Sequence, residues 1–329
     1  MHSFVDITKI WLIAVRAYSL PVSIMSWLVP FIFACFKNGD IKYGILSLIG
    51  IITLHMATNL FDDAIDYTRE KQKIDKGLKK DFNFQKGKCS CIFEGKLTLQ
   101  QYYIVSFILF LIAAIIALYF IFLYGTNLLY IIIPTGILCA LYPLLGCLGL
   151  GEIVVATIFS PLLYLGVFYS MTGFFSLEIL IISISTGFLS VAVLHNHMLL
   201  DFKYDESNRK ITLCRLCRTE KNAFILLVVI ISLAYINIIT FVFLKLLSPY
   251  FLITLFSLPT AITLYKVMKT HIENPSNIVK PNIFMGNTKE IKNVPIEQRN
   301  FLIKFLIVRN LLSIFTLLIC IAVVLSKIL

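Results

Sequence analysis

Residues 43–70 read YGILSLIGIITLHMATNLFDDAIDYTRE. The part from Tyr43 to Leu60 contains no Asp, Glu, Lys or Arg, and about 20 such residues in a helix cross the ~30 Å hydrocarbon core of a bilayer. Carboxylates follow almost at once, at Asp62 and Asp63. An apolar run that ends in acidic residues predicts a membrane-spanning helix with an acidic cluster at one end.

The composition of the whole chain agrees with this interpretation. Of its 329 residues, 59% are hydrophobic and 14% are charged, and the mean hydropathy of +0.88 excludes an ordinary soluble domain. Nine apolar runs are long enough to span a bilayer: Trp11–Phe36, Tyr43–Leu60, Tyr102–Tyr124, Leu128–Leu145, Ile153–Tyr169, Leu177–Leu200, Ala223–Leu244, Tyr250–Met268 and Phe301–Leu325. The sequence therefore predicts an all-α fold, a polytopic membrane bundle of nine transmembrane helices with a cytoplasmic cap, forming a single domain over residues 1–329.

The first run differs from the others because Arg16 and Pro21 interrupt its beginning. A charge that enters the hydrocarbon is costly, so Arg16 should meet phosphate, an acidic side chain or the interface. We expect this segment to start as an interfacial turn before the span proper.

The basic residues predict the topology rather than a nucleic-acid surface. Of the 29 Lys and Arg residues that help to give the net charge of +11, 21 lie in the loops at 67–99, 201–221 and 266–300. Nine spans place these three loops on one side, which the positive-inside rule makes cytoplasmic. The N-terminus would then also be cytoplasmic, in the inner (plasma) membrane of a cell.

The first acidic cluster extends along one face of a helix. His55, Asn59, Asp62 or Asp63, Asp66 and Glu70 follow one another at spacings of three or four residues. Like charges at this spacing repel one another, and a bound cation would remove that cost. Oxygen ligands without thiols favour Mg²⁺, which combines carboxylates with phosphate oxygens and water.

A second cluster lies at the end of the sixth run. Asp201 and Asp205 are one helical turn apart, His197 precedes them by one turn, and Arg209 and Lys210 follow. One acidic cluster alone would be interpreted as a solvated loop. Two clusters on the same predicted side, one with a basic rim, favour divalent cations that hold a diphosphate.

Four cysteines allow a different metal site. Cys89, Cys91, Cys214 and Cys217 all fall on the predicted cytoplasmic side and would fit a four-thiolate zinc site. The alternative is that they are small apolar residues in a reducing compartment.

The two acidic motifs resemble those of the UbiA superfamily of intramembrane prenyltransferases. The run Asp62-Asp63-x-x-Asp66-x-x-x-Glu70 is similar to the family's first signature, and Asp201-x-x-x-Asp205 matches its second. Arg16-Ala-Tyr-Ser-Leu-Pro21 resembles the opening motif, and Lys86 and Lys88 lie near the position of a family Arg. The resemblance implies Mg²⁺-dependent transfer of a prenyl group from a polyprenyl diphosphate to an aromatic small molecule within the lipid bilayer.

The resemblance also implies a role for each site residue. The metal ligands would be Asp62, Asp63, Asp66, Glu70, Asp201 and Asp205. The diphosphate would be bound by Asn59, Arg16, Arg209 and Lys210. The residues expected to act in catalysis are Asp63, Asp66, Asp201, Asp205 and His197. His197 would serve as a base or acceptor ligand, and the alternative is a histidine that is hydrogen-bonded at a helix end.

The middle of the chain is most similar to the 1,4-dihydroxy-2-naphthoate polyprenyltransferases of menaquinone biosynthesis. The similarity lies in Gly149-Leu-Gly-Glu152 and in Asn59-Leu60, whereas His195-Asn-His197 stands where those enzymes carry Asn and Arg. Glu152 would shape the acceptor pocket or cap a helix. The alternatives are a prenyltransferase with another acceptor, a terpene cyclase of the same fold, and, from a different class, a membrane transporter.

Overall fold

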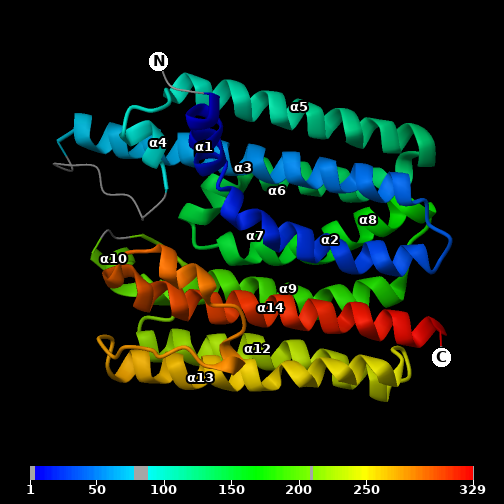
Figure 1. Ribbon diagram of the computed structural model, residues 1–329. Helices are drawn as coiled ribbons and strands as arrows, with labels where there is room; N and C mark the ends of the chain where they lie inside the picture. The colour runs from blue at the N-terminus through cyan, green and yellow to red at the C-terminus, as the bar shows by residue number, and fades with distance from the viewer. Residues whose placement is uncertain (1–3, 78–87, 208–209, 329) are drawn as a thin grey trace. The chain divides into compact units, whose positions relative to one another are not determined.

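The computed structural model describes residues 4–77, 88–207 and 210–328 (Figure 1). Within these ranges the regular secondary structure is entirely helical. The α-helices are α1 (Phe4–Ala14), α2 (Leu20–Cys35), α3 (Ile41–Asp75), α4 (Ser90–Phe93), α5 (Leu99–Tyr124), α6 (Leu129–Cys147), α7 (Gly151–Thr157), α8 (Leu163–Thr172), α9 (Leu177–Leu200), α10 (Phe202–Ser207), α11 (Leu213–Leu216), α12 (Glu220–Phe243), α13 (Leu258–Glu273) and α14 (Ile296–Ile328). The 3₁₀ segments are Ala17–Ser19, Thr126–Leu128, Pro249–Ser257, Ile283–Met285 and Lys289–Asn293, and a π-helical turn covers Ile158–Leu162.

Nine helical segments in the described part of the chain are long and apolar enough to cross a membrane, as predicted. They are Ala17–Cys35, Ile41–Asp75, Leu99–Tyr124, Thr126–Cys147, Gly151–Thr172, Leu177–Leu200, Glu220–Phe243, Pro249–Glu273 and Gln298–Ile328. The protein is therefore a multi-pass membrane protein. Which membrane holds it and which side is cytoplasmic stay predictions.

Two compact units divide the chain by their internal contacts. The first unit contains Met1–Ile24 and Lys42–Leu144, and the second contains Met25–Ile41 and Leu145–Leu329. The single domain over residues 1–329 stays a prediction. Each acidic motif belongs to a different unit, so each has its own structural surroundings.

In the first unit, helix α3 packs along α5. The ring of Tyr43 meets Phe120 edge-on, with centroids 6.0 Å apart. Farther along, a Cβ at Gly50 would lie 3.3 Å from Cγ2 of Ile116, so glycine allows the two helices to approach closely. The hydroxyl of Ser106 then donates to the Ala57 carbonyl oxygen at 2.9 Å. These three contacts, spaced along α3 and α5, hold α3 in place as far as its acidic end.

The first helical segment is interrupted at Arg16, as the sequence predicts. Helix α1 ends at Ala14, and Arg16 has a left-handed backbone conformation with φ of 53°. A 3₁₀ turn follows, and α2 begins at Leu20 with Pro21 in its first turn, where proline needs no backbone donor. The joint lies beside a core of buried residues that includes Leu60 and Tyr102. The first span is consequently shorter than the predicted run Trp11–Phe36.

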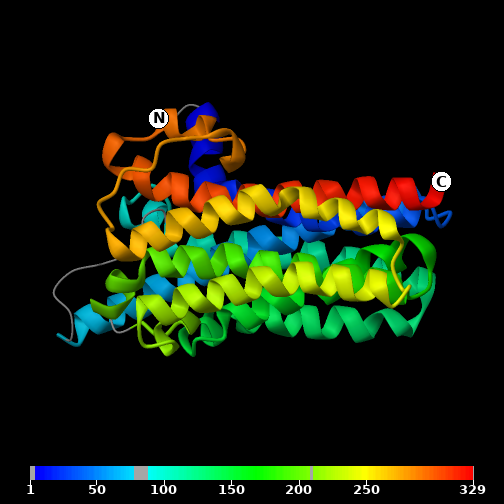
Figure 2. The same ribbon diagram turned by 90° about the horizontal axis from the view of Figure 1, so that it is seen from below.

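Helix α9 forms the centre of the second unit. It contacts α7, α8, α12 and α14, and α13 packs against α12 and α14 (Figures 1 and 2). Small residues let its neighbours approach: a Cβ at Gly187 would lie 2.5 Å from the side chain of Ser160 in the π-helical turn. Of its spanning window, 67% is buried, which agrees with the absence of Asp, Glu, Lys and Arg from residues 179–200. The second acidic motif begins where this buried helix ends.

Candidate functional site

The first acidic cluster lies on α3, which runs without interruption from Ile41 to Asp75. The predicted stripe is therefore on one helix, and its members lie one turn apart. Asp62 and Asp63 are only 5% and 1% exposed. Carboxylates that are buried to this degree need cationic or hydrogen-bonding partners.

Arg16 supplies the first of these partners. Its Nη2 lies 3.1 Å from Oδ2 of Asp62 and also contacts Oδ1 of Asp63. Burial lowers the pKa of Arg16, but Asp63 and Asp62 raise it more, and the net pKa lies well above its usual value. The left-handed joint between α1 and α2 thus places a permanent positive charge on the cluster. An acidic side chain is one of the three partners predicted for Arg16, and diphosphate binding by this residue stays a prediction.

Lys88 supplies the second partner. Its ammonium group lies 3.0 Å from Oδ2 of Asp62 and also contacts Oδ2 of Asp66. Burial lowers the pKa of Lys88, but Asp62 and Asp66 outweigh it and hold the pKa above its usual value. The backbone N–H of Cys89 donates to Oδ2 of Asp63 at 3.0 Å. Three carboxylates therefore share two cations in this structure. The sequence indicated Lys88 only through its place near a family Arg.

Two further residues of the stripe, Asn59 and His55, form hydrogen bonds to the segment that joins α1 to α2. Nδ2 of Asn59 donates to the Val15 carbonyl oxygen at 3.0 Å and to Oγ of Ser19 at 3.2 Å. The His55 ring lies within hydrogen-bond distance of Ser19 and Ser23, at 3.1 Å and 2.6 Å. These contacts keep Arg16 directed at the acidic cluster. Diphosphate binding by Asn59 stays a prediction.

The remaining acid of the stripe, Glu70, lies one turn beyond Asp66. Its Oε1 pairs with Lys73 at 2.8 Å. Arg69 is 3.8 Å from Oδ1 of Asp66 and donates to the Pro143 carbonyl oxygen at 3.0 Å. The outer end of the stripe is therefore surrounded by cations, whereas its inner end is buried.

The second acidic cluster has a different arrangement. Asp201 caps the C-terminus of α9, and Asp205 lies on the short helix α10. The Asp205 backbone N–H donates to the Asp201 carbonyl oxygen at 2.8 Å, so the chain turns between the two acids. Nζ of Lys210 lies 3.6 Å from Oδ1 of Asp205. Arg209 lies outside the described residues.

Burial dominates the electrostatics of this second cluster. It raises the pKa of Asp201 despite the charge of Lys210. The pKa of Asp205 is raised to about 6 by burial, again against the opposing effect of Lys210. Nearby positive charge is insufficient to compensate for lost hydration. A cation bound here would favour the ionised carboxylates.

His197 is held between Asp201 and two aromatic rings. Its Nδ1 lies 3.4 Å from Oδ2 of Asp201. The rings of Phe301 and Phe305 meet it edge-on, with centroids 5.7 Å and 5.6 Å away. The imidazole can position the Asp201 carboxylate, and it is a chemically suitable group for proton transfer.

The donor atoms of both clusters suit Mg²⁺. They are carboxylate oxygens without sulfur, the ligand set that hard divalent cations prefer. Because the Lys88 ammonium contacts Asp62 and Asp66 together, oxygens from successive turns of α3 already converge on one positive charge. The residues present therefore fit the metal.

The four cysteines are divided between the two units. The thiol of Cys89 donates to the Asp63 carbonyl oxygen at 3.2 Å, and that of Cys91 to the Ile10 carbonyl oxygen at 3.6 Å. Burial raises the pKa of Cys89 and of Cys214, which keeps these thiols protonated in the absence of a metal. The four-thiolate zinc site stays a prediction.

The fold and the two clusters define a class, multi-pass membrane proteins with oxygen-rich cation sites. The chain belongs to the UbiA prenyltransferase family, whose model matches residues 19–287. The family match covers both acidic motifs. Members of this family are prenyltransferases, and the chain is an enzyme of that class.

Solved structures agree with the family assignment at the level of the fold. One, concerned with digeranylgeranylglyceryl phosphate synthase in membranes, has a TM-score of 0.62 and 15% identity, and covers 96% of this chain and 98% of its own. A UbiA homologue from Aeropyrum pernix K1 has a TM-score of 0.59, 14% identity and coverages of 92% and 97%. A UbiA homologue from Archaeoglobus fulgidus, bound to GPP and Mg²⁺, has a TM-score of 0.53, 11% identity and coverages of 94% and 99%. No curated protein sequence matches the chain.

Proposed function

We propose that the protein transfers a polyprenyl group from a polyprenyl diphosphate to an aromatic acceptor, with Mg²⁺ as the cofactor. The observation that carries the proposal is the convergence of three α3 carboxylates on two cations, Arg16 and Lys88. The similar A. fulgidus protein is bound to GPP and Mg²⁺, which supports the same ligands here.

In the first unit, we assign Asp62, Asp63 and Asp66 to the metal and the two basic residues to the substrate. A divalent cation would replace the side-chain charges of Arg16 and Lys88 as the partner of these carboxylates. Arg16 and Lys88 would then be free to pair with diphosphate oxygens, and an arginine can bind such oxygens with two parallel N–H groups. Glu70 would contribute from one turn farther along α3.

In the second unit, Asp201 and Asp205 would act as ligands and Lys210 as the phosphate-facing cation. Arg209, outside the described residues, is assigned the same role from the sequence. Because burial favours protonated Asp205, with a pKa of about 6, metal binding at neutral pH would remove the cost of the buried charge.

The reaction breaks the bond between prenyl C1 and the ester oxygen that joins it to the diphosphate. Bound Mg²⁺ would supply charge stabilisation to the leaving diphosphate and so promote formation of an allylic cation. A carbon–carbon bond then forms with the electron-rich ring, which loses a proton. His197 is our candidate to receive that proton, directly or through water, since Asp201 fixes its ring.

The acceptor that we propose to test first is 1,4-dihydroxy-2-naphthoate, which would place the enzyme in menaquinone biosynthesis. The argument is the similarity of Gly149-Leu-Gly-Glu152 to enzymes that use this acceptor. A second candidate is the hydroxyl group of a lipid-like acceptor, because one similar structure concerns digeranylgeranylglyceryl phosphate synthase.

The test is product analysis by mass spectrometry. The purified protein in liposomes receives Mg²⁺, geranylgeranyl or longer diphosphates, and either 1,4-dihydroxy-2-naphthoate or a glycerol-phosphate lipid. We expect stoichiometric diphosphate and a prenylated product, either the dihydroxynaphthoate that has lost a ring proton or the naphthoquinol that has lost its carboxylate as CO2. A prenyl ether would establish the second candidate, diphosphate release without an acceptor would indicate a cyclase, and ion flux without diphosphate release would contradict the proposal.

A further inference from the structure

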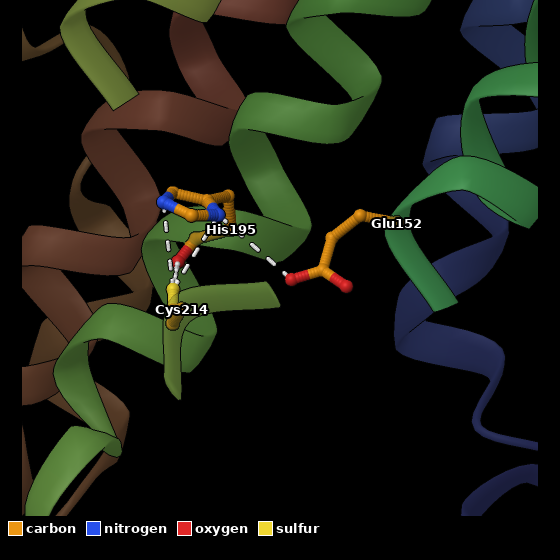
Figure 3. A group of neighbouring side chains, drawn as sticks. All are labelled: Glu152, His195 and Cys214. Atoms are coloured by element: carbon orange, nitrogen blue, oxygen red, sulfur yellow. Dashed lines mark hydrogen bonds and ion pairs between the residues drawn. The ribbon is translucent and has the colours of Figure 1, made fainter. Parts of the chain in front are cut away.

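Three side chains outside both acidic clusters meet in the second unit. They are Glu152 at the start of α7, His195 near the end of α9, and Cys214 on α11 (Figure 3). One ligand atom from each lies within 4.8 Å of the others. Glu152 is 3% exposed, and the other two residues are fully buried. A carboxylate, an imidazole and a thiol from three separate segments thus converge away from solvent.

The histidine is fixed in one orientation. Its Nε2 lies 2.9 Å from the Ala223 carbonyl oxygen, and a carbonyl only accepts hydrogen bonds. Nε2 therefore carries the proton, and in the neutral ring Nδ1 is unprotonated, with Oε1 of Glu152 3.8 Å away. A backbone carbonyl that holds the far nitrogen is the usual second partner of a metal-binding histidine.

Glu152 has a carboxylate oxygen without a hydrogen-bond donor among the described residues. This atom, Oε1, lies 3.8 Å from Nδ1 of His195, toward which Figure 3 shows it pointing. A charge-assisted hydrogen bond would be about 2.7–2.9 Å long, so the pair is not hydrogen-bonded. Two lone-pair atoms face each other across a gap that requires a cation.

We propose that Glu152, His195 and Cys214 bind a Zn²⁺ ion and leave its fourth position to water. In a tetrahedral site Zn²⁺ lies about 2.0–2.3 Å from oxygen, nitrogen and sulfur ligands, which sets the ligand atoms about 3.4–3.6 Å apart. The structure has 3.8 Å between Oε1 and Nδ1 and 3.4 Å between Nδ1 and Sγ. Sγ is also 3.4 Å from Nε2, so it lies over the face of the ring, where the thiol donates to the His195 carbonyl oxygen at 3.3 Å. The Cys214 side chain must rotate from this position to bring Sγ to an ion that Nδ1 binds.

The donor chemistry separates this site from the acidic clusters. A thiolate and an imidazole favour Zn²⁺ over Mg²⁺. One carboxylate, one thiolate and one Zn²⁺ ion together have no net charge, so binding removes the cost of burying Glu152. The proton of the Cys214 thiol leaves to solvent when the ion binds.

Glycine at position 149 allows the three segments to meet. Gly149 has a φ of 78°, and a Cβ there would lie 3.1 Å from Cγ2 of Ile211 and 3.3 Å from Cδ1 of Leu216. The chain that precedes α7 can therefore pack directly on the segment around α11. The ion would tie α11, which follows Lys210 closely, to α7 and α9.

The experiment measures metal in the purified full-length protein. We expect about one zinc ion per chain by inductively coupled plasma mass spectrometry. In Glu152→Gln and Cys214→Ser the zinc content should fall at least tenfold. Cys217→Ser is the matched control, because its thiol donates to the Leu213 carbonyl oxygen at 3.4 Å and lies outside the cluster. Asp201→Asn should also retain zinc, since its ligand role concerns the other metal.

Cobalt provides an independent readout that needs no variant. Wild-type protein loaded with Co²⁺ should show sulfur-to-cobalt charge-transfer absorption in the near ultraviolet, and Cys214→Ser should lack it. Absence of this absorption in wild type would overturn the proposal even if the variants cannot be purified. Equal zinc contents in Cys214→Ser and Cys217→Ser would overturn it as well.

Discussion

The two acidic clusters use the same carboxylate chemistry but differ in how their charge is balanced. In the first, Arg16 and Lys88 already pair with Asp62, Asp63 and Asp66. In the second, burial raises the pKa of both aspartates, and Lys210 compensates only partly. The comparison teaches that protein cations compensate the buried charge of the first cluster, whereas the second carries buried carboxylate charge that an added cation would compensate.

The largest expected effect comes from removing one carboxylate charge in either cluster. Under the proposed function each cluster binds Mg²⁺, which would stabilise charge on the leaving group, so Asp63→Asn and Asp201→Asn should each lower turnover by about 10²–10³-fold or more. Diphosphate release in liposomes measures this. Asp75→Asn, at the exposed end of the same helix as Asp63, is the matched control and should stay active. Full activity in either cluster variant would remove that cluster from the mechanism.

The next effect concerns Lys88, a protein cation that belongs to the first cluster. Lys88→Met should raise the KM for the diphosphate about 10–100-fold, equivalent to about 1.4–2.7 kcal/mol of lost charged contacts. It should also tighten Mg²⁺ binding without substrate, since Asp62 and Asp66 lose their shared ammonium. Titration with Mn²⁺, followed by its electron paramagnetic resonance, measures metal binding. Lys76→Met, which removes an exposed lysine just beyond the end of α3, is the control, and weaker metal binding in Lys88→Met would contradict the comparison.

The pH dependence of stability tests the second cluster. Folding raises the pKa of Asp205 from about 3.9 to about 6, so the folded state favours the proton, and its ionisation destabilises the unit as pH rises between these values. Without metal, Asp205→Asn should therefore stabilise the protein by about 2–3 kcal/mol at pH 8 and by little at pH 4.

Thermal unfolding in detergent with a chelator measures this difference. Glu206→Gln is the matched control, because its carboxylate is exposed on the same short helix. A pH-independent effect of Asp205→Asn would show that burial does not control this carboxylate.

The effect at His197 is the smallest of the series if its ring only positions Asp201. If the ring mainly positions Asp201, His197→Gln should lower kcat about tenfold and leave the pH profile unchanged. If it accepts the proton, the loss should exceed about 10²-fold, and the acidic limb of the kcat profile should disappear. The profile of kcat against pH distinguishes these roles. Unchanged kcat would exclude both.

Features that depend on nearby residues were predictable from the sequence. The nine spans, the interruption at Arg16 and the single-helix stripe from His55 to Glu70 follow from hydropathy and helical period. The motifs Asp62–Glu70 and Asp201–Asp205 also suffice to indicate the family that the comparison establishes.

Contacts between residues that are far apart in the sequence were not predictable. Lys88 reaches Asp62 only because the segment before α5 folds back on α3, and no periodicity encodes that return. Glu152, expected to shape the acceptor pocket or cap a helix, instead lies beside His195 and Cys214, which are 43 and 62 positions later in the chain. Local patterns specify helices, whereas packing decides which polar side chains meet.

The joint at Arg16 has a consequence for how this position tolerates mutation. Its φ of 53° costs a non-glycine residue about 1–2 kcal/mol, so the backbone favours glycine, while the carboxylates of Asp62 and Asp63 favour arginine. No single amino acid satisfies both demands. In a library of all substitutions at this codon, glycine should relieve the backbone strain but leave Asp62 and Asp63 without their arginine, which costs more, so we expect it to lower both protein yield and turnover. A selection for protein yield alone would therefore keep the arginine that turnover also needs.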